Sequence, residues 1–298
     1  MDTNIKTKAR TMLIISVIVF GTLGIFTRNI NVTSGELALY RAVLATILIS
    51  VYMFFTGKFS KIKNIKKDGI LLFFSGMSMG TNWILLFEAY RYTSISSATI
   101  SYYFAPVIVT IICPFLFKEK MTKKKIICFI VSTIGLVLTI GINNITSGGN
   151  DFIGIMFGLM AACFYACVII FNKLIKNVGG IERTFLQFCS AVIVLTPYVI
   201  LTSGFNLDKL NSTGWIYLLI VGLFHTGITY CLYFSSLKDL PGQESSIISY
   251  IDPLVAVLIS VLIAKESMTI WQIIGAILIL GFTMLNEIPK KSKKTVIT

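Results

Sequence analysis

The residue with the clearest chemical potential is an acidic side chain inside an apolar stretch. Asp252 lies about nine residues into the run 243–264 and immediately precedes Pro253. A carboxylate at the centre of a bilayer-spanning helix costs roughly 2.5–3.5 kcal/mol on insertion scales, so it needs a partner, a water-filled cavity or a proton. We therefore expect Asp252 to accept a proton or a cation inside a cavity. The alternative is a structural carboxylate that is hydrogen-bonded to neighbouring helices.

The second candidate is the chain's one histidine, His225, in the middle of the apolar run 214–236. An imidazole ionises close to neutral pH and can exchange a proton during a reaction cycle. A lone histidine in an apolar run is also typical of a neutral, hydrogen-bonded packing residue. If His225 faces Asp252, the two side chains can share a proton.

The remaining charged candidates lie near the ends of apolar runs. Glu88 precedes Arg91 by three residues, a spacing that predicts either an interfacial ion pair or a gate and cation site. Glu244 lies at the start of its run and is a candidate for one mouth of a cavity. Arg41 lies within the run 36–56, where we expect it to brace the helix bundle rather than bind substrate.

Aromatic rings and an amide occupy further positions suited to a cavity wall. They suit an amphipathic metabolite, although aromatic residues in membrane helices also serve packing and interface belts. The set consists of Phe20, Asn82, Trp83, Tyr102, Tyr103, Tyr165, Tyr230 and Tyr250.

The elements that must position these residues follow from the composition. Of 298 residues, 55% are hydrophobic and 13% charged, and the mean hydropathy is +0.84, which excludes an ordinary soluble enzyme. Apolar runs of about 20 residues each match the thickness of a bilayer core. We predict ten transmembrane helices at 11–27, 36–56, 69–90, 95–117, 125–142, 152–172, 182–202, 214–236, 243–264 and 269–287.

Charge patterning predicts how these helices are oriented. The chain has 26 Lys and Arg against 13 Asp and Glu, but the basic residues form short clusters between apolar runs rather than a nucleic-acid-binding surface. With a cytoplasmic N-terminus, 21 basic residues fall on the cytoplasmic side and four on the other, as the positive-inside rule requires. We expect a multi-pass protein of the cytoplasmic (inner) membrane with both termini in the cytoplasm and no nucleic-acid partner.

An internal repeat divides the chain. A shift of 147 residues aligns Tyr103 with Tyr250 and Pro106 with Pro253, and gives 11 identities over 43 positions. Five helices per unit is an odd number, so the copies must cross the membrane in opposite senses. Asp252 aligns with Ala105, so the repeat does not explain the carboxylate. The predicted repeats are residues 11–142 and 152–287, within a single membrane domain of residues 1–298.

Several motifs resemble the EamA family of the drug/metabolite transporter superfamily. They are Tyr-Thr-Ser-Ile-Ser-Ser-Ala (92–98), Phe-Ala-Pro-Val (104–107), Phe-Lys-Glu-Lys-Met-Thr (117–122), Tyr-Ile-Asp-Pro-Leu (250–254) and Ala-Lys-Glu-Ser-Met-Thr (264–269). The resemblance implies two inverted five-helix repeats around a central cavity, lined mainly by helices 1, 3, 4, 6, 8 and 9. It also implies transport of amino acids or other metabolites, mostly outward. Relatives often carry an acid before the second-half proline, as Asp252 does.

The function that we expect is secondary active transport of a small metabolite, such as an amino acid or an amphipathic or cationic compound, by alternating access. Export and proton coupling are the leading hypotheses, and import or exchange of a cationic or zwitterionic metabolite is the alternative. A passive channel or a membrane-embedded enzyme is disfavoured, because the spans lack a continuous polar stripe and clustered catalytic residues. We expect the lipid bilayer and a small-molecule substrate as partners, no cofactor and no metal, and we predict no oligomeric state. The six cysteines contain no CxxC pair.

Overall fold

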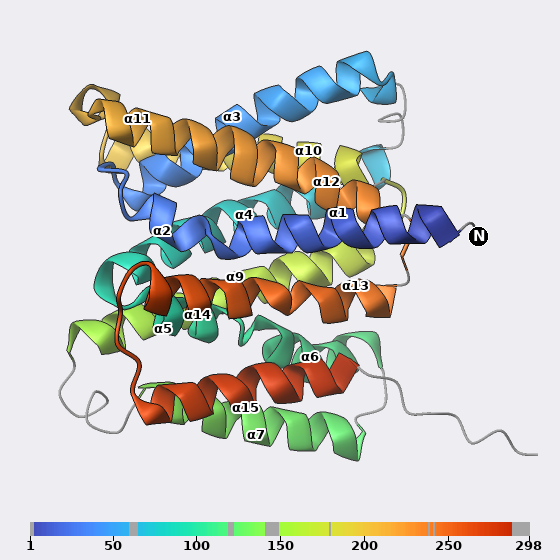
Figure 1. Cartoon of the computed structure of the whole chain (residues 1–298). Coiled ribbons are helices and arrows are strands. Elements are labelled where there is room, and N and C mark those ends of the chain that lie inside the picture. Colours follow the sequence, from blue (N-terminus) through green and yellow to red (C-terminus); the bar gives the residue numbers. More distant parts are fainter. Residues whose placement is uncertain are drawn as a thin grey trace, which may run out of the picture.

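The computed structural model describes residues 3–59, 65–118, 122–140, 149–178, 180–237, 239–240 and 242–287. Within these ranges the regular elements are all helices, and their long axes lie side by side in layers (Figure 1). Some predicted features lie outside the described residues: residues 141–142 of the first repeat, residues 119–121 of the repeated motif, and the basic residues Lys61, Lys63, Lys120, Lys238, Lys290, Lys291, Lys293 and Lys294.

Among the described residues, the first half of the chain forms seven helical segments, and the second half forms nine. The first set is α1 (Thr3–Gly21), α2 (Leu23–Thr27), α3 (Ser34–Phe55), α4 (Ile65–Tyr92), α5 (Ile95–Tyr102), α6 (Ala105–Phe117) and α7 (Lys123–Ile140). The second set is α9 (Asn150–Leu174), α10 (Gly180–Thr202), η2 (Leu207–Lys209), α11 (Ser212–Leu219), η3 (Ile220–Ile228), α12 (Thr229–Ser236), α13 (Gly242–Ser249), α14 (Ile251–Leu262) and α15 (Ile270–Glu287).

Seven of the described segments are long and apolar enough to cross a membrane. They are Ile5–Thr27, Ser34–Phe55, Asp68–Tyr92, Ile95–Phe117, Asn150–Leu174, Gly180–Thr202 and Ser212–Ser236, with shorter apolar helices at Ile251–Leu262 and Ile270–Leu285. Large apolar side chains project outward, and Phe55, Phe115 and Leu201 are 81%, 78% and 84% exposed. A surface of this kind is stable in hydrocarbon, where a helix satisfies its own backbone hydrogen bonds.

Two helices that the sequence predicted as continuous are divided in the middle. The segment 95–117 breaks after Tyr102 into α5 and α6, and the segment 243–264 breaks after Ser249 into α13 and α14. Each break precedes a proline by four residues, Pro106 in the first and Pro253 in the second. Proline lacks an N–H and its ring collides with the carbonyl four residues earlier, so the α-helical ladder cannot continue there.

Two further backbone features interrupt the regular helices. The predicted helix 214–236 contains a nine-residue π-helix, η3, between α11 and α12. Two described non-glycine residues have a positive φ, Lys118 at 53° and Lys265 at 57°. Each follows an apolar helix, α6 and α14 respectively, and both belong to the repeated Lys-Glu motif.

Small residues let the helices pack closely. A Cβ on Gly21 of α1 would lie 2.6 Å from the carbonyl oxygen of Asp252 on α14. A Cβ on Gly135 of α7 would lie 2.8 Å from the carbonyl oxygen of Gly275 on α15. The α7–α15 pair lies at one side of the bundle, whereas α4 packs between α9 and α10 nearer its centre (Figure 1).

Candidate functional site

A cavity of about 410 Å³ lies between helices of the two halves of the chain. This volume falls within the range of small-molecule binding sites. The first half contributes residues from α1–α5, and the second half from α9, α10 and α12–α14. Seven of the residues singled out in the sequence line it: Phe20, Trp83, Tyr102, Tyr103, Tyr165, Tyr230 and Asp252.

Asp252 is held where the two broken helices meet. It lies in the first turn of α14, and its Oδ2 accepts a hydrogen bond from the Tyr103 hydroxyl at the end of α5. A helix N-terminus favours a negative charge, and a phenol donates strongly to a carboxylate. Asp252 therefore lines the cavity and is also hydrogen-bonded between helices, and its role as a proton or cation acceptor stays a prediction.

Aromatic rings form much of the remaining wall. Tyr102 stacks on Tyr165 with ring centroids 5.1 Å apart, and Phe20 meets Tyr230 edge to face at 5.0 Å. These contacts join α5 to α9 and α1 to α12. The rings offer apolar faces to a bound molecule, and the tyrosine hydroxyls offer hydrogen bonds.

His225 does not lie in the cavity wall among the described residues. It is buried in η3, where its Nε2 lies 2.7 Å from the Thr22 hydroxyl and its Nδ1 lies 3.4 Å from the Ile220 carbonyl oxygen. Both ring nitrogens therefore have partners other than Asp252 among the described residues. The hypothesis that His225 and Asp252 share a proton requires a contact that this arrangement does not provide.

Asn82 and Tyr250 also lie outside the wall. Asn82 is buried and donates its amide N–H to the Ala161 carbonyl oxygen at 2.7 Å, which joins α4 to α9. Its neighbour Trp83 reaches the cavity because successive residues on a helix point about 100° apart. Tyr250 is buried at the break before α14. Of the two repeat-related tyrosines, Tyr103 and Tyr250, Tyr103 is the one that lines the described cavity wall.

Two arginines line the cavity and were not predicted as binding residues. Arg41 lies on α3, and the sequence pattern predicted only that this arginine braces the bundle. Arg183 lies on α10 beside Gln187. A signal was present for Arg41, since it is a basic residue inside an apolar run, just as Asp252 is an acidic one.

The predicted gate residues lie at the two ends of the bundle. Arg91 donates to Glu88 at 3.4 Å and lines a second hollow of about 660 Å³, whose wall includes the end of α2 and the start of α3. Glu244 on α13 pairs with Arg10 on α1, near the N-terminus of the chain. Neither Glu88 nor Glu244 is part of the described wall of the central cavity.

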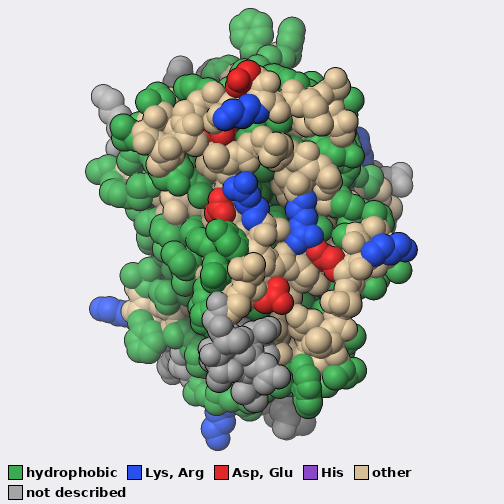
Figure 2. Space-filling model, turned by 90° about the vertical axis from the view of Figure 1, so that its left-hand side faces the viewer, with side chains coloured by type: hydrophobic (Ala, Val, Ile, Leu, Met, Phe, Trp, Pro, Cys, Tyr) green, Lys and Arg blue, Asp and Glu red, His purple; other side chains and the backbone are tan. Residues whose placement is uncertain are grey.

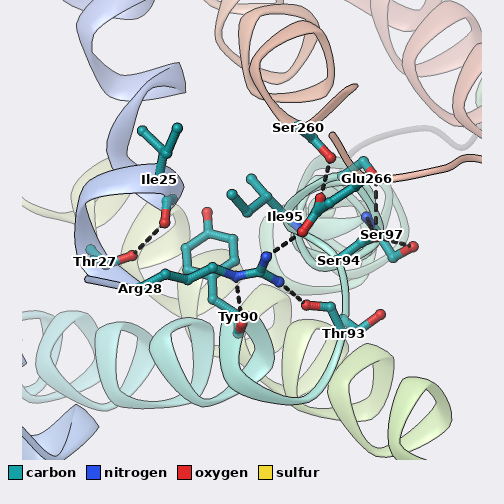
Figure 3. A network of polar contacts seen from close by, with 12 residues as sticks. Ile25, Thr27, Arg28, Tyr90, Thr93, Ser94, Ile95, Ser97, Ser260 and Glu266 are labelled. Carbon is teal, nitrogen blue, oxygen red and sulfur yellow. Dashed lines mark hydrogen bonds and ion pairs between the residues drawn. The ribbon is translucent and has the colours of Figure 1, made fainter. Parts of the chain in front are cut away.

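A network of polar contacts ties several helix ends together beside the second hollow, which Arg28 and Tyr90 also line. Arg28 pairs with Glu266 and donates its Nε to the Tyr90 carbonyl oxygen at 2.8 Å (Figure 3). Glu266 also accepts from the Ile95 backbone N–H at 2.9 Å and from the Ser260 hydroxyl. The network therefore ties α2 to α4, α5 and the segment after α14. Tyr90 itself lines both hollows.

The same end of the bundle is shown face-on in Figure 2. Charged side chains gather over the central part of this face, and hydrophobic side chains surround much of its rim. A polar end with an apolar perimeter is the form expected of a helix bundle whose sides face lipid.

The described residues form an all-helical bundle with apolar sides and an aromatic, charged cavity between its halves, which is the form of an integral membrane protein. The family model described as "EamA-like transporter family" matches residues 7–141 and 152–287, so the chain belongs to this family. It is a transporter family, and the chain is not an enzyme.

Relatives and a solved structure agree with this assignment. The chain is 30% identical over 295 residues to "Uncharacterized transporter YxxF" of Bacillus subtilis (strain 168), covering 98% of this chain and 93% of that protein. It is 24% identical to an "Uncharacterized transporter" of Clostridium kluyveri, covering 85% and 87%. A solved chain titled "Crystal structure of protein" matches with a TM-score of 0.65 and 16% identity over 94% of this chain and 96% of that chain, which shows a shared fold.

Proposed function

We propose that the protein is a secondary active transporter that moves a small metabolite through the central cavity by alternating access. The observation that carries this proposal is the Tyr103–Asp252 contact at two facing helix breaks within a cavity of about 410 Å³. Transporters place substrate and coupling-ion sites at broken helices near the midplane, where two bundles move against each other. We assign outward transport coupled to protons, with Asp252 as the proton acceptor.

The proposed architecture is ten spans in two inverted five-helix repeats, with both termini in the cytoplasm. Paired backbone features support it, since Lys118 and Lys265 share a left-handed conformation 147 residues apart, the spacing of the sequence repeat. The two helix breaks lie at the same spacing, and the family model matches the chain twice. The division of 21 against four basic residues supports the orientation in the cytoplasmic membrane.

The test is transport by the purified protein in liposomes without ATP, with phenylalanine, phenethylamine and phenylacetate as probes. These compounds share one ring and differ in charge. A carrier exchanges at least one of them saturably and is stimulated by the same compound on the opposite side. Import or exchange without proton coupling is the competing function, and it predicts the same counterflow with no response to a pH gradient.

Asp252→Asn tests the proton role. A pH gradient of about one unit provides about 1.4 kcal/mol per proton, so a one-proton carrier accumulates its substrate about tenfold. In Asp252→Asn the ratio of accumulated to external substrate should fall towards one, while exchange of labelled for unlabelled substrate continues. Asp208→Asn, which changes an exposed acid in η2, is the matched control and should accumulate normally. Undiminished gradient-driven accumulation in Asp252→Asn would refute the assignment.

A further inference from the structure

Arg41 is a buried cation with no acidic partner among the residues that the structure describes. Its residue is 3% exposed, and the ion pairs among the described residues are Arg10–Glu244, Arg28–Glu266 and Arg91–Glu88. Its one hydrogen bond to a described residue runs from Nε to the Thr226 hydroxyl at 2.6 Å. The Nη1 atom is buried without any hydrogen-bond partner. A buried, ionised donor of this kind is costly unless an anion or water completes its hydrogen bonds.

The surroundings of Arg41 hold the guanidinium in place. Its Cζ lies 4.4 Å from the centre of the Trp83 ring and 5.7 Å from that of Phe87. The Thr226 hydroxyl donates to the Val221 carbonyl oxygen at 2.7 Å, so its oxygen lone pairs are left to accept from Nε. The π-helix η3 sets this geometry, because Val221 lies five residues before Thr226. The two Nη groups thus form a preorganised fork for a planar anion.

The other cavity arginine is committed to the backbone. The Nη groups of Arg183 donate to the carbonyl oxygens of Asn172, Ile175 and Val178, each at 3.0 Å. These carbonyls lie at or just beyond the end of α9, where cations are favoured. Although Nε of Arg183 is buried without a partner, its fork is already occupied. Arg183 is therefore a structural cation, and Arg41 is the one whose fork is free of described partners.

The charges of the cavity wall also favour an anion. The described lining contains two arginines and one carboxylate, Asp252, which already accepts from Tyr103. The wall therefore carries an excess of positive charge. A substrate that is only a cation would enter against this field, whereas a carboxylate would compensate Arg41.

We propose that Arg41 binds the carboxylate group of the transported metabolite, and that the substrates are small organic acids or amino acids with an aromatic or apolar side. The bidentate pairing of arginine with carboxylate gives orientation as well as affinity. The rings of Trp83, Tyr102 and Tyr165 would then receive the apolar part. This inference rests on the proposed function and names the substrate class for the same cavity.

The test compares phenylacetate with its uncharged analogue phenylacetamide on the full-length protein in lipid nanodiscs. Binding is measured by calorimetry and by the shift in melting temperature. We expect the wild type to bind phenylacetate at least about tenfold more tightly than phenylacetamide, because the amide cannot form the charge-assisted pair. Arg41→Gln should abolish this preference, and Arg41→Lys should retain part of it, since lysine keeps the charge but lacks the fork.

Lys209→Gln is the control, because Lys209 is an exposed cation in η2 that lines neither hollow, and its loss should leave the preference unchanged. Equal binding of acid and amide by the wild type, or an unchanged preference in Arg41→Gln, overturns the proposal. If Arg41→Gln does not fold, the wild-type ligand pair and Arg41→Lys still decide the question. Counterflow of phenethylamine without phenylacetate binding would reject the carboxylate site and leave the transporter. Arg41-dependent binding with no counterflow of any probe would support the carboxylate site and reject the proposed transport.

Discussion

The contact between Tyr103 and Asp252 joins the two halves of the chain at single-residue scale. The donor lies at the end of α5 and the acceptor in the first turn of α14, so the bond crosses the centre of the bundle. Hydrogen bonds to charged groups contribute about 1.5–3 kcal/mol, roughly twice the value for neutral pairs. This contact should therefore stabilise the conformation described here as well as hold the carboxylate in the cavity.

Tyr103→Phe should lower the free energy of unfolding by about 1–3 kcal/mol, because the Asp252 carboxylate loses its donor. Denaturant titration of the purified protein in detergent measures the change. Tyr102→Phe is the matched control, since its hydroxyl makes no hydrogen bond to a described residue, although its ring stacks on Tyr165. In Asp252→Asn, the added Tyr103→Phe change should cost less than it does in the wild type. Equal losses in Tyr103→Phe and Tyr102→Phe would contradict the role given to the bond.

The sequence identified some residues of the candidate site and not others, and the difference lies in what a single side chain reveals about its position. Asp252 could be identified because a carboxylate within an apolar run is rare and costly. Asn82 and Trp83 could not be told apart in the same way, because neighbouring residues on a helix point about 100° apart and the facing helices decide which one reaches the cavity. Arg41 was visible as a charge, but its unpartnered Nη1 depends on contacts with α4 and η3 that the sequence does not contain.

At the scale of elements, α1 packs closely against α14 next to Asp252. Gly21 on α1 faces the Asp252 carbonyl oxygen and the Val255 side chain. The repeat revealed the prolines in this region, and proline chemistry explains why the predicted continuous helices divide. The π-helix could not be foreseen, because apolar periodicity does not distinguish an i–5 from an i–4 hydrogen-bond pattern over nine residues.

Gly21→Ala should destabilise the protein by about 1–3 kcal/mol, because the added methyl group would lie 2.6 Å from the Asp252 carbonyl oxygen and α1 must shift. The melting temperature of the purified protein should fall. Gly281→Ala on α15 is the matched control, since a Cβ there meets open space and alanine favours the helix by about 0.5–1 kcal/mol. A Gly21→Ala variant as stable as Gly281→Ala would show that α1 and α14 are not in fixed contact.

At the scale of the whole molecule, two hollows lie next to each other, and the proposed transport would use both. The central cavity and the hollow beside Arg91 share Tyr90. The Arg28–Glu266 network ties four segments together at the end of the bundle shown in Figure 2. Alternating access requires one end to be closed by contacts that can break and re-form. In the proposed cycle, the Arg28–Glu266 network is the set of contacts that we expect to break and re-form at this end.

Weakening the network should open this end of the molecule. Ala256→Cys places a thiol in the central cavity, and none of the six natural cysteines lines that cavity. In intact cells, a membrane-impermeant maleimide should label Ala256→Cys several-fold faster when Glu266→Gln is added, because Arg28, Ile95 and Ser260 lose a charged acceptor. Glu88→Gln breaks only the neighbouring Arg91 pair and should leave the labelling rate unchanged. A substitution that destabilises the closed conformation shifts the population towards the open one. Identical labelling rates with and without Glu266→Gln would therefore mean that the network does not hold this end closed.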